Sequence, residues 1–249
     1  MTDDRKTLIL TGASRGIGHA TVRRFSNENW RIITCSREEV PDACQRDPNW
    51  HGHIAVELAD QTDVARFINQ ANDLLAGDPL HALVNNAAVS PKTESKERLG
   101  CLNGDLDTWR AVFELNFFAP LVLSRGFAGA LGRGAKESSA AVVNITSIAG
   151  HEIHPFAGSA YSTSKAALSA LTRELAVEFA ELGVRVNAVA PGEIETEMVG
   201  DEYEPLINRI PMHRMGTAEE VAACVFQLCN EDFSYVTGTE LFITGGQHL

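Results

Sequence analysis

Short apolar runs with β-branched members alternate along the chain with longer segments whose apolar residues recur at helical spacing. Runs of the first kind predict buried strands, and segments of the second kind predict amphipathic helices. The expected strands are Lys6–Leu10, Arg31–Cys35, Gly52–Leu58, Ala82–Asn85, Ala140–Ile145, Val184–Val189 and Glu240–Ile243. The expected helices are about Gly16–Asn27, Thr62–Ala76, Leu106–Leu131, Tyr161–Glu181 and Ala218–Asn230.

Strands and helices that alternate in this way, without repeats or a linker, predict an α/β fold. We expect one doubly wound, Rossmann-like domain over residues 1–249, with a seven-stranded, mainly parallel sheet and helices on both faces. Thr217 and Glu220 have the spacing of a capping box at the start of the last helix. Ligands of such folds bind beyond the carboxyl ends of the strands, so the chemistry should gather there.

Composition fits a soluble protein, because 44% of the 249 residues are apolar and 22% are charged. The net charge of −12 does not suit a surface that binds a polyanion, so no nucleic-acid partner is expected. No stretch approaches the ~18 apolar residues of a membrane span. The acidic start and the short apolar run behind it do not resemble a signal peptide, and we therefore expect a cytoplasmic protein that does not bind membranes.

The cysteines are odd in number, scattered and without a Cys-x-x-Cys spacing. They are interpreted as free thiols in a reducing compartment: Cys35, Cys44, Cys101, Cys224 and Cys229. His51 and His53 stand ahead of the third expected strand and are interpreted as part of a turn. No metal site is predicted.

Tyr161 and Lys165 stand four residues apart in Tyr-Ser-Thr-Ser-Lys, and Ser147 lies upstream. On a helix, positions i and i+4 share one face, so the ammonium would lie close to the phenol. A free phenol has a pKa of about 10, and a neighbouring cation favours the phenolate. Such a tyrosine could exchange a proton with a substrate oxygen that a serine hydroxyl holds in place. An ordinary surface tyrosine and lysine would show the same spacing.

A second motif, Thr11-Gly-Ala-Ser-Arg-Gly-Ile-Gly18, follows the first expected strand and opens the first expected helix. Strand, glycine-rich turn and helix form the context in which glycines indicate a dinucleotide site. Glycines let the backbone approach a pyrophosphate, and the helix N-terminus favours its charge. A βα turn that merely contains glycine is the structural alternative.

Together these residues resemble the short-chain dehydrogenase/reductase family. The glycine pattern Thr11-Gly-x-x-x-Gly-x-Gly18 and the Tyr161-x-x-x-Lys165 pair are those of its shorter members. Asn85-Asn-Ala-Ala88 is similar to the family's motif after the fourth strand, and Pro191-Gly-x-Ile-x-Thr196 is similar to the loop under the nicotinamide. The matches run in the family's order along almost the whole chain.

The resemblance implies an oxidoreductase that transfers a hydride between a nicotinamide cofactor and a carbonyl or secondary alcohol. Its catalytic residues would be Asn116, Ser147, Tyr161 and Lys165. Ser147 would bind the reacting oxygen and Tyr161 would be the general acid or base. Lys165 would lower the pKa of Tyr161 and bind the nicotinamide ribose. Asn116 would keep a water in the proton path, or it is a polar residue that satisfies a kink in the Leu106–Leu131 helix, which is compatible with that role.

The same resemblance implies the cofactor-binding set Gly12, Ser14, Arg15, Gly16, Ile17, Gly18, Arg37, Glu57, Leu58, Asn86, Ala87, Tyr161, Lys165, Pro191, Gly192, Ile194 and Thr196. An acidic residue after the second strand would favour NAD(H), but this chain has Arg37 there, and Arg15 adds a second positive charge. NADP(H) is therefore expected over NAD(H), although the two arginines could instead pair with Glu38 or Glu39. Thr196 could bond the carboxamide or cap the next segment.

Residues from about 192 to 215 are expected to cover the substrate pocket. Their acidic side chains are interpreted as a solvated surface: Glu193, Glu195, Glu197, Asp201, Glu202 and Glu204. If those charges face the pocket, a neutral or cationic substrate is favoured over a phosphorylated one. His151 and His154 could touch the substrate, but exposed loop histidines are the preferred interpretation.

Two other functions stay open: a dehydratase or epimerase of the same fold, and an NADPH-binding regulator without catalysis. A homo-oligomer, tetramer or dimer, is expected from the family resemblance, through the long helices that carry Asn116 and Tyr161. Phe117, Phe118, Leu121 and Val122 would serve that interface or the protein's own core.

Overall fold

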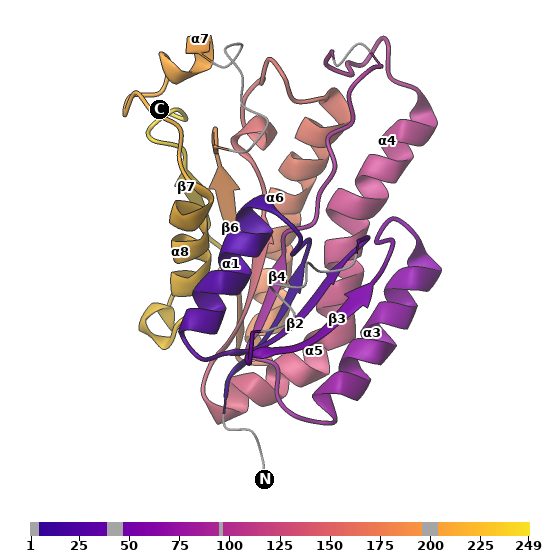
Figure 1. Ribbon diagram of the computed structural model, residues 1–249, viewed down its shortest axis with the longest axis vertical. Coiled ribbons are helices and arrows are strands. Elements are labelled where there is room, and N and C mark those ends of the chain that lie inside the picture. The colour runs from indigo at the N-terminus through magenta and orange to yellow at the C-terminus, as the bar shows by residue number, and fades with distance from the viewer. Residues whose placement is uncertain (1–4, 39–46, 95–96, 196–203) are drawn as a thin grey trace.

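A computed structural model describes residues 5–38, 47–94, 97–195 and 204–249, and these form one parallel sheet with flanking helices (Figure 1). The strands are β1 (Thr7–Thr11), β2 (Arg31–Ser36), β3 (Trp50–Ala55), β4 (Ala82–Asn85), β5 (Ala140–Ile145), β6 (Val184–Pro191) and β7 (Glu240–Ile243). Their order is β3-β2-β1-β4-β5-β6-β7, and every neighbouring pair is parallel. The predicted doubly wound, Rossmann-like α/β fold is confirmed.

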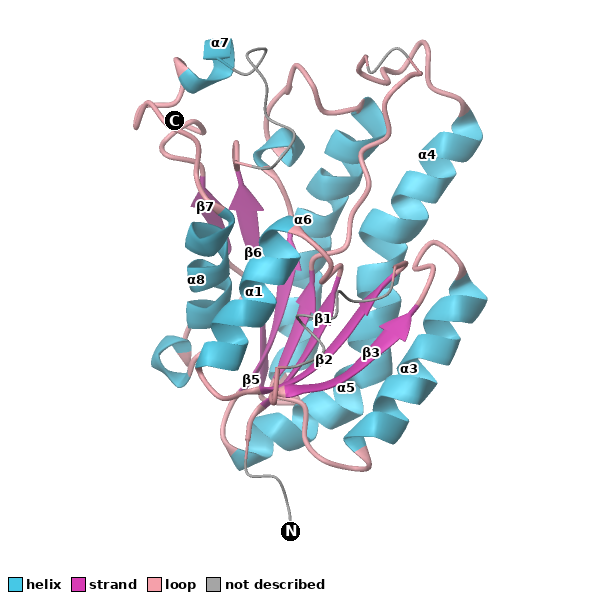
Figure 2. Ribbon diagram, in the orientation of Figure 1, coloured by secondary structure: helices cyan, strands magenta, loops and turns pink. Residues whose placement is uncertain are grey.

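The helices are α1 (Gly16–Asn27), α3 (Gln61–Leu75), α4 (Leu106–Phe113), α5 (Ala119–Glu137), α6 (Ser159–Ala180), α7 (Glu204–Ile207) and α8 (Ala218–Cys229) (Figure 2). Two apolar cores divide them between the faces of the sheet. Ile9 of β1 belongs to the core with α3, α5 and α6, whereas its neighbours Leu8 and Leu10 belong to the core with α1 and α8. Side chains that alternate between two buried faces explain why β1, β2, β4, β5 and β6 are buried along their whole length.

The order of the strands reverses between β1 and β4, because the chain builds outward from β1 in one direction before it crosses to β4. At such a switch point the loops after neighbouring strands diverge and leave a crevice at the carboxyl ends. The turn after β1 contains Gly12, and the loop after β4 contains Asn86. The fold thus brings the glycine motif and the Asn-Asn motif to the same edge.

The expected helix Leu106–Leu131 is longer and less regular than predicted. It runs to Glu137, and a π-helical turn at Glu114–Phe118 separates α4 from α5. By length and composition the continuous stretch Leu106–Glu137 could cross a membrane, which the sequence interpretation had excluded. Leu123 and Phe127 of α5 are nevertheless buried in the core against the sheet, as in a core helix.

The third strand begins and ends earlier than expected, at Trp50 and Ala55 instead of Gly52 and Leu58. Its partner β2 ends at Ser36, whose carbonyl accepts the last bond from Val56, so the backbone leaves the sheet there. His51 and His53 therefore lie within β3, and the interpretation as a turn is wrong. Both face β2: His51 contacts Arg31, and the His53 ring lies 2.8 Å from the Thr34 hydroxyl.

The capping box at the start of α8 is confirmed, because the side chains of Thr217 and Glu220 each accept the other residue's backbone N–H. Four cysteines of the described ranges are free thiols, and Cys44 lies outside those ranges. Within the same ranges no group of three or more His, Cys, Asp or Glu side chains could hold a metal ion.

Candidate active site

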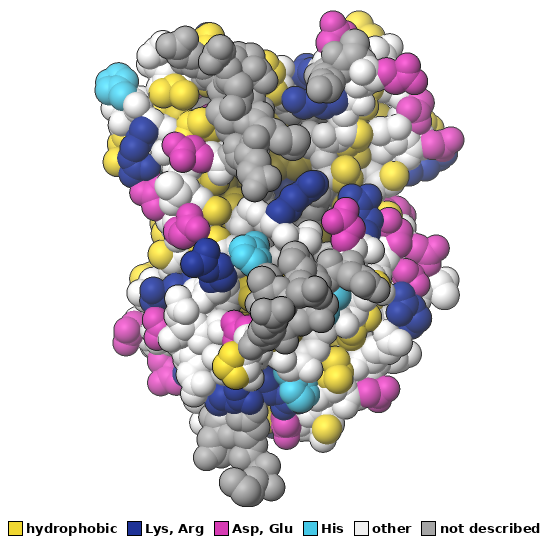
Figure 3. Space-filling model, in the orientation of Figure 1, with side chains coloured by type: hydrophobic (Ala, Val, Ile, Leu, Met, Phe, Trp, Pro, Cys, Tyr) yellow, Lys and Arg dark blue, Asp and Glu magenta, His cyan; other side chains and the backbone are white. Residues whose placement is uncertain are grey.

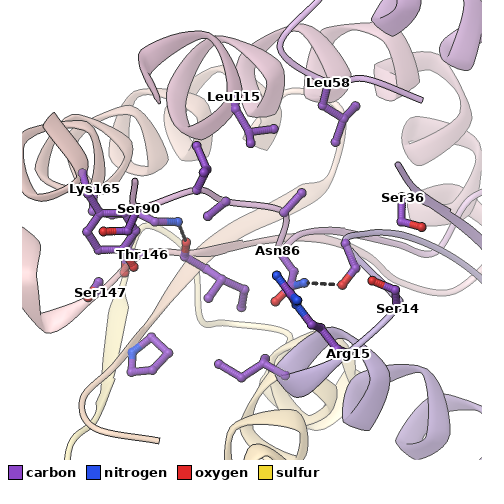
Figure 4. Close-up of a pocket in the computed structure, with 18 of the residues that line it drawn as sticks. Ser14, Arg15, Ser36, Leu58, Asn86, Ser90, Leu115, Thr146, Ser147 and Lys165 are labelled. Carbon is purple, nitrogen blue, oxygen red and sulfur yellow. Dashed lines mark hydrogen bonds between the residues drawn. The ribbon is translucent and has the colours of Figure 1, made fainter. Parts of the chain in front are cut away.

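A cavity of about 550 Å³ opens at the carboxyl ends of the strands, beside the switch point (Figure 4). Most residues expected to bind cofactor or substrate line it. They are Gly12, Ser14, Arg15, Ile17, Arg37, Glu57, Leu58, Asn86, Ala87, Ser147, Tyr161, Lys165, Pro191, Gly192 and Ile194. Figure 4 shows Ser14, Arg15 and Ser36 at one end of the cavity and Thr146, Ser147 and Lys165 at the other.

Gly16 and Gly18 do not line the cavity, and Gly18 is required for another reason. A Cβ at Gly18 would lie 2.0 Å from the carbonyl oxygen of Gly12, so only glycine lets α1 start directly against the turn. Gly12 itself has a φ of +73°, and a Cβ there would lie 2.9 Å from the Cα of Ala87. The close packing places the N-terminus of α1 at the cavity. Thr196 lies outside the described residues.

Asn86 joins the loop after β4 to the glycine turn. Its side-chain amide donates to the carbonyls of Thr11 at 3.0 Å and Gly12 at 2.9 Å. In return, the Thr11 hydroxyl accepts the backbone N–H groups of Asn86 and Ala87, each at 3.0 Å. These four hydrogen bonds fix the relative position of the two segments that form the cavity floor.

Ser147 and Tyr161 come from two different elements. Ser147 follows β5 and caps the 3-10 turn Ile148–Gly150, where its hydroxyl accepts the N–H of Ala149 at 3.1 Å. Tyr161 stands in the first turn of α6. A hydrogen bond connects the two side chains and acts to lower the pKa of Tyr161, because it favours the phenolate.

Lys165 lies one turn after Tyr161, as the spacing predicted, with its Nζ 5.7 Å from the centroid of the Tyr161 ring. Only 2% of the residue is exposed. Its Nζ donates to the carbonyl oxygen of Ile145 at 2.5 Å, which anchors the side chain to the end of β5. Burial lowers the pKa of Lys165 to about 7, because removal from water disfavours the charged ammonium.

The pKa of Tyr161 is raised, against the expectation that Lys165 would lower it. Burial of the phenol is the largest cause, the hydrogen bond from Ser147 opposes it, and the negative charge of Glu193 raises the pKa further. The buried Lys165 is itself only partly protonated near neutral pH, which weakens the cation on which the expectation relied. Spacing identified the neighbour correctly but did not show how strongly both groups are desolvated.

Asn116 is fully buried in the π-helical turn and does not line the cavity. Its Oδ1 accepts the N–H of Val89 at 2.9 Å, and its Nδ2 donates to the carbonyl of Val89 and to the Ser164 hydroxyl, both at 3.0 Å. The side chain thus ties the loop after β4 to α6, next to Lys165. Asn116 therefore has one hydrogen-bonding position left for a water, the second lone pair of Oδ1.

Arg15 and Arg37 are exposed side chains on the wall of the cavity, at the end away from Lys165. Neither forms an ion pair within the described residues, so pairing of Arg37 with Glu38 is not observed, and Glu39 lies outside the description. In Figure 3, Lys and Arg side chains lie near the middle of the face, although the chain is acidic overall. Within the described residues, Arg15 and Arg37 thus leave positive charge available to a ligand.

Two residues at the Ser147 and Tyr161 end of the cavity differ from the sequence interpretation. Glu193 is buried and lines the cavity, so it is not part of a solvated acidic surface as Glu195 is. His154 is also buried and contacts Glu193, whereas His151 is exposed as expected and lies 2.9 Å from Glu240. The position of Glu193 inside the Pro191–Ile194 motif was a signal that could have placed it in the site.

Sequence reasoning also passed over Ser36, Ser90 and Thr146, which line the cavity from the ends of β2, the loop after β4 and the end of β5. Ser36 and Thr146 directly precede Arg37 and Ser147, and Ser90 lies two residues after the Asn85–Ala88 motif. Position relative to strand ends could therefore have found them.

Fold and cavity together define an α/β protein of the dinucleotide-binding class. The family model described as Enoyl-(Acyl carrier protein) reductase matches residues 12–248. Protein FixR of Bradyrhizobium diazoefficiens is 50% identical over 246 residues, which are 98% of this chain and 87% of FixR. The chain belongs to the short-chain dehydrogenase/reductase family, whose members are NAD(P)-dependent oxidoreductases.

Solved structures agree with this assignment. An oxidoreductase of the short-chain family from Brucella ovis, in complex with a partially ordered NAD, is 47% identical, with a TM-score of 0.83 and coverage of 97% of this chain and 100% of that chain. Pseudomonas aeruginosa RhlG, as an NADP active-site complex, is 30% identical, with a TM-score of 0.86 and coverage of 98% and 96%. The similar structures thus include complexes with each nucleotide.

Proposed function

We propose that the protein transfers a hydride between NADP(H) and a carbonyl compound or secondary alcohol, with Ser147, Tyr161, Lys165 and Asn116 as its site. One observation carries the proposal: Tyr161 is hydrogen-bonded to Ser147 and adjoins the buried Lys165 in the cavity that the glycine turn enters. A surface tyrosine and lysine on a solvated helix would not have these neighbours.

The residues divide the work in a defined way. A nicotinamide bound in the cavity would supply or accept the hydride at the carbonyl carbon. The Ser147 hydroxyl donates to the carbonyl oxygen and orients it. As the C=O π electrons move to that oxygen, the Tyr161 phenol gives it a proton, and the substrate becomes a neutral secondary alcohol. Lys165 stabilises the phenolate left behind until a proton returns from solvent, and Asn116 holds α6 and the loop after β4 in place.

A panel of ketones, aldehydes and secondary alcohols, followed through the absorbance of NADPH and NADH, tests the proposal. At least one carbonyl compound should be reduced with loss of one reduced nucleotide per alcohol formed. Tight binding of NADPH without turnover of any panel member would instead support a non-catalytic regulator. Conversion of a substrate without net change in nucleotide absorbance would support a dehydratase or epimerase.

Preference for NADP(H) rests on Arg37 and Arg15, the positive side chains at the adenosine end of the cavity. A guanidinium can bind the phosphate of NADP(H) through two parallel, charge-assisted hydrogen bonds. The ribose hydroxyl of NAD(H) carries no charge and cannot form this pair of bonds. Arg37→Glu should weaken NADPH binding about 10- to 100-fold and leave NADH binding close to that of the wild type. The control Arg125→Glu, on the exposed face of α5, should leave both dissociation constants unchanged. Equal weakening for both nucleotides would contradict the assignment.

One domain over residues 1–249 is proposed to carry binding and catalysis, which the single continuous sheet supports. A cytoplasmic homo-oligomer, tetramer or dimer, is proposed as well. Leu121 and Val122 pack against the core, whereas Phe118 on the π-helical turn and Val177 on α6 are 41% and 74% exposed. These exposed apolar side chains on the long helices support contacts between copies. Light scattering should give a mass above that of one chain.

A further inference from the structure

Two ionisable side chains beside Tyr161 have no part in the mechanism above. His154 lies in the loop between β5 and α6, and Glu193 follows β6 directly. The Nε2 of His154 and the Oε1 of Glu193 are 2.5 Å apart, and each residue is only 8% exposed. Glu193 lines the same cavity as Tyr161 and Ser147, and its charge acts on the Tyr161 phenol.

The hydrogen bonds of His154 determine the charge of this pair. Its Nδ1 accepts two backbone N–H groups, from Phe156 at 3.2 Å and Ala157 at 3.1 Å, so it carries no proton. Nε2 therefore carries the ring proton and donates it to Oε1. The imidazole is then neutral and Glu193 is a carboxylate, whose negative charge acts on the Tyr161 phenol. His154 therefore fixes the carboxylate of Glu193 without neutralising it.

Glu193 keeps one carboxylate oxygen for a ligand. Oε1 is occupied by His154, whereas no residue of the described ranges donates a hydrogen bond to Oε2. Oε2 is not one of the fully buried polar atoms that lack a partner, so it is accessible, and Glu193 lines the cavity. An oriented, charged acceptor next to the reacting centre is a recognition group for a hydrogen-bond donor.

We propose that Glu193, held by His154, determines specificity by accepting a hydrogen bond from a hydroxyl or ammonium group next to the reacting carbonyl. The inference rests on the proposed function and narrows its substrates to hydroxy ketones or amino ketones and the corresponding alcohols. Ser147 and Tyr161 bind the reacting oxygen, and Glu193 binds the neighbouring donor. The same negative charge opposes a carboxylate or phosphate at that place, because like charges repel in a desolvated site.

Four ketones of nearly equal size test this: 1-hydroxy-2-butanone, 1-amino-2-butanone, 3-pentanone and 2-oxobutanoate. With NADPH, kcat/KM of the wild type should be about 10- to 100-fold higher for the hydroxy ketone and the amino ketone than for 3-pentanone. It should be lowest for 2-oxobutanoate. A larger value for the amino ketone would identify the donor as a cation, and a larger value for the hydroxy ketone would identify it as a neutral hydroxyl.

Glu193→Gln is the discriminating variant, because glutamine can still accept from Nε2 of His154 but carries no charge. It should reduce the preference for the amino ketone by at least 10-fold, make 2-oxobutanoate a better substrate and change the rate with 3-pentanone least. Glu195→Gln, two residues further along and exposed, should keep the wild-type ranking. A Glu193→Gln variant with the wild-type ranking would overturn the inference.

A measurement on the wild type alone does not depend on whether a variant folds. Calorimetry with NADPH-loaded protein, on which an alcohol cannot be oxidised, should show tighter binding of 1-amino-2-butanol or butane-1,2-diol than of 3-pentanol, and equal binding would also overturn the inference. The two proposals fail separately. If 3-pentanone is reduced as fast as the hydroxy ketone and the amino ketone, the specificity role of Glu193 is wrong and the proposed reductase activity stands. If no ketone in the broader panel is reduced, the proposed reductase activity itself is wrong.

Discussion

The two ends of the cavity are built in different ways. At the end proposed to take the adenosine, here the adenosine end, the backbone of the glycine turn provides the geometry, and Gly12 and Gly18 are needed because a Cβ would collide with neighbouring backbone. At the catalytic end, side chains from three elements meet: Ser147 after β5, Tyr161 and Lys165 on α6, and Glu193 after β6. Steric fit governs the first end, and desolvation and charge govern the second. Substitutions at one end should therefore leave the other largely intact.

The largest effect is expected at the catalytic end, from Tyr161→Phe. Loss of a general acid or base lowers turnover about 10²- to 10⁴-fold, whereas the glycine turn proposed to receive the nucleotide is untouched. We expect kcat to fall within that range and the dissociation constant of NADPH to change little, as measured by steady-state kinetics and fluorescence titration.

Tyr235→Phe makes the same chemical change at a fully exposed tyrosine and should leave kcat unchanged. Near-normal turnover of Tyr161→Phe would show that another group transfers the proton. A large loss of NADPH affinity in Tyr161→Phe would show that the two ends are not independent.

Gly18→Ala should disrupt the packing of α1 against the glycine turn at the adenosine end. The added Cβ would lie 2.0 Å from the Gly12 carbonyl oxygen, which belongs to the backbone and has no rotamer to escape. We expect the free energy of unfolding to fall by about 3 kcal/mol, the upper part of the usual range for overpacking. NADPH affinity should fall as well, because α1 must move away from the turn.

Gly129→Ala is the matched control. Gly129 is exposed in the middle of α5 and has nothing within 4 Å of an added Cβ, so alanine should stabilise the helix by about 0.5–1 kcal/mol. Chemical denaturation of both variants gives the comparison. An unchanged stability of Gly18→Ala would mean that steric fit does not govern this end.

Lys165→Met tests whether desolvation governs the catalytic end, through the pH dependence of the free energy of unfolding. The unfolded chain keeps the Lys165 proton up to the ordinary pKa of 10.5, whereas the folded protein releases it above about pH 7. Between these values the unfolded state binds more protons, so the stability of the wild type rises with pH, by about 1 kcal/mol per pH unit.

Denaturation of wild type and Lys165→Met between pH 7 and 8.5, below the ordinary pKa of the buried thiols, should show this slope in the wild type only. Lys136→Met, at an exposed site on α5, should keep the wild-type slope. The same slope in all three proteins would show that the Lys165 ammonium is not desolvated as its burial indicates.

Much of the architecture could be predicted because it depends on local signals. The bounds of α1 were correct to the residue, and those of α8 to one residue, because a glycine turn and a capping box mark where they begin. A kink at Asn116 was one interpretation of the sequence, but the π-helical form of the turn at Glu114–Phe118 could not be predicted, since nothing local distinguishes it from α-helix. Asn116 lies in this turn, and its side chain is held by Val89 and Ser164 from two other segments.

The sequence by itself determined the order of the elements, the glycine turn and the spacing that brings Tyr161 next to Lys165, because each depends on residues close in the chain. Only the tertiary structure decided the electrostatics of the catalytic end. Burial sets the pKa of Lys165 and raises that of Tyr161, and a contact across 39 positions, between His154 and Glu193, creates a buried negative charge. Desolvation and charge depend on distances through space, and these are not encoded in any single stretch of the chain.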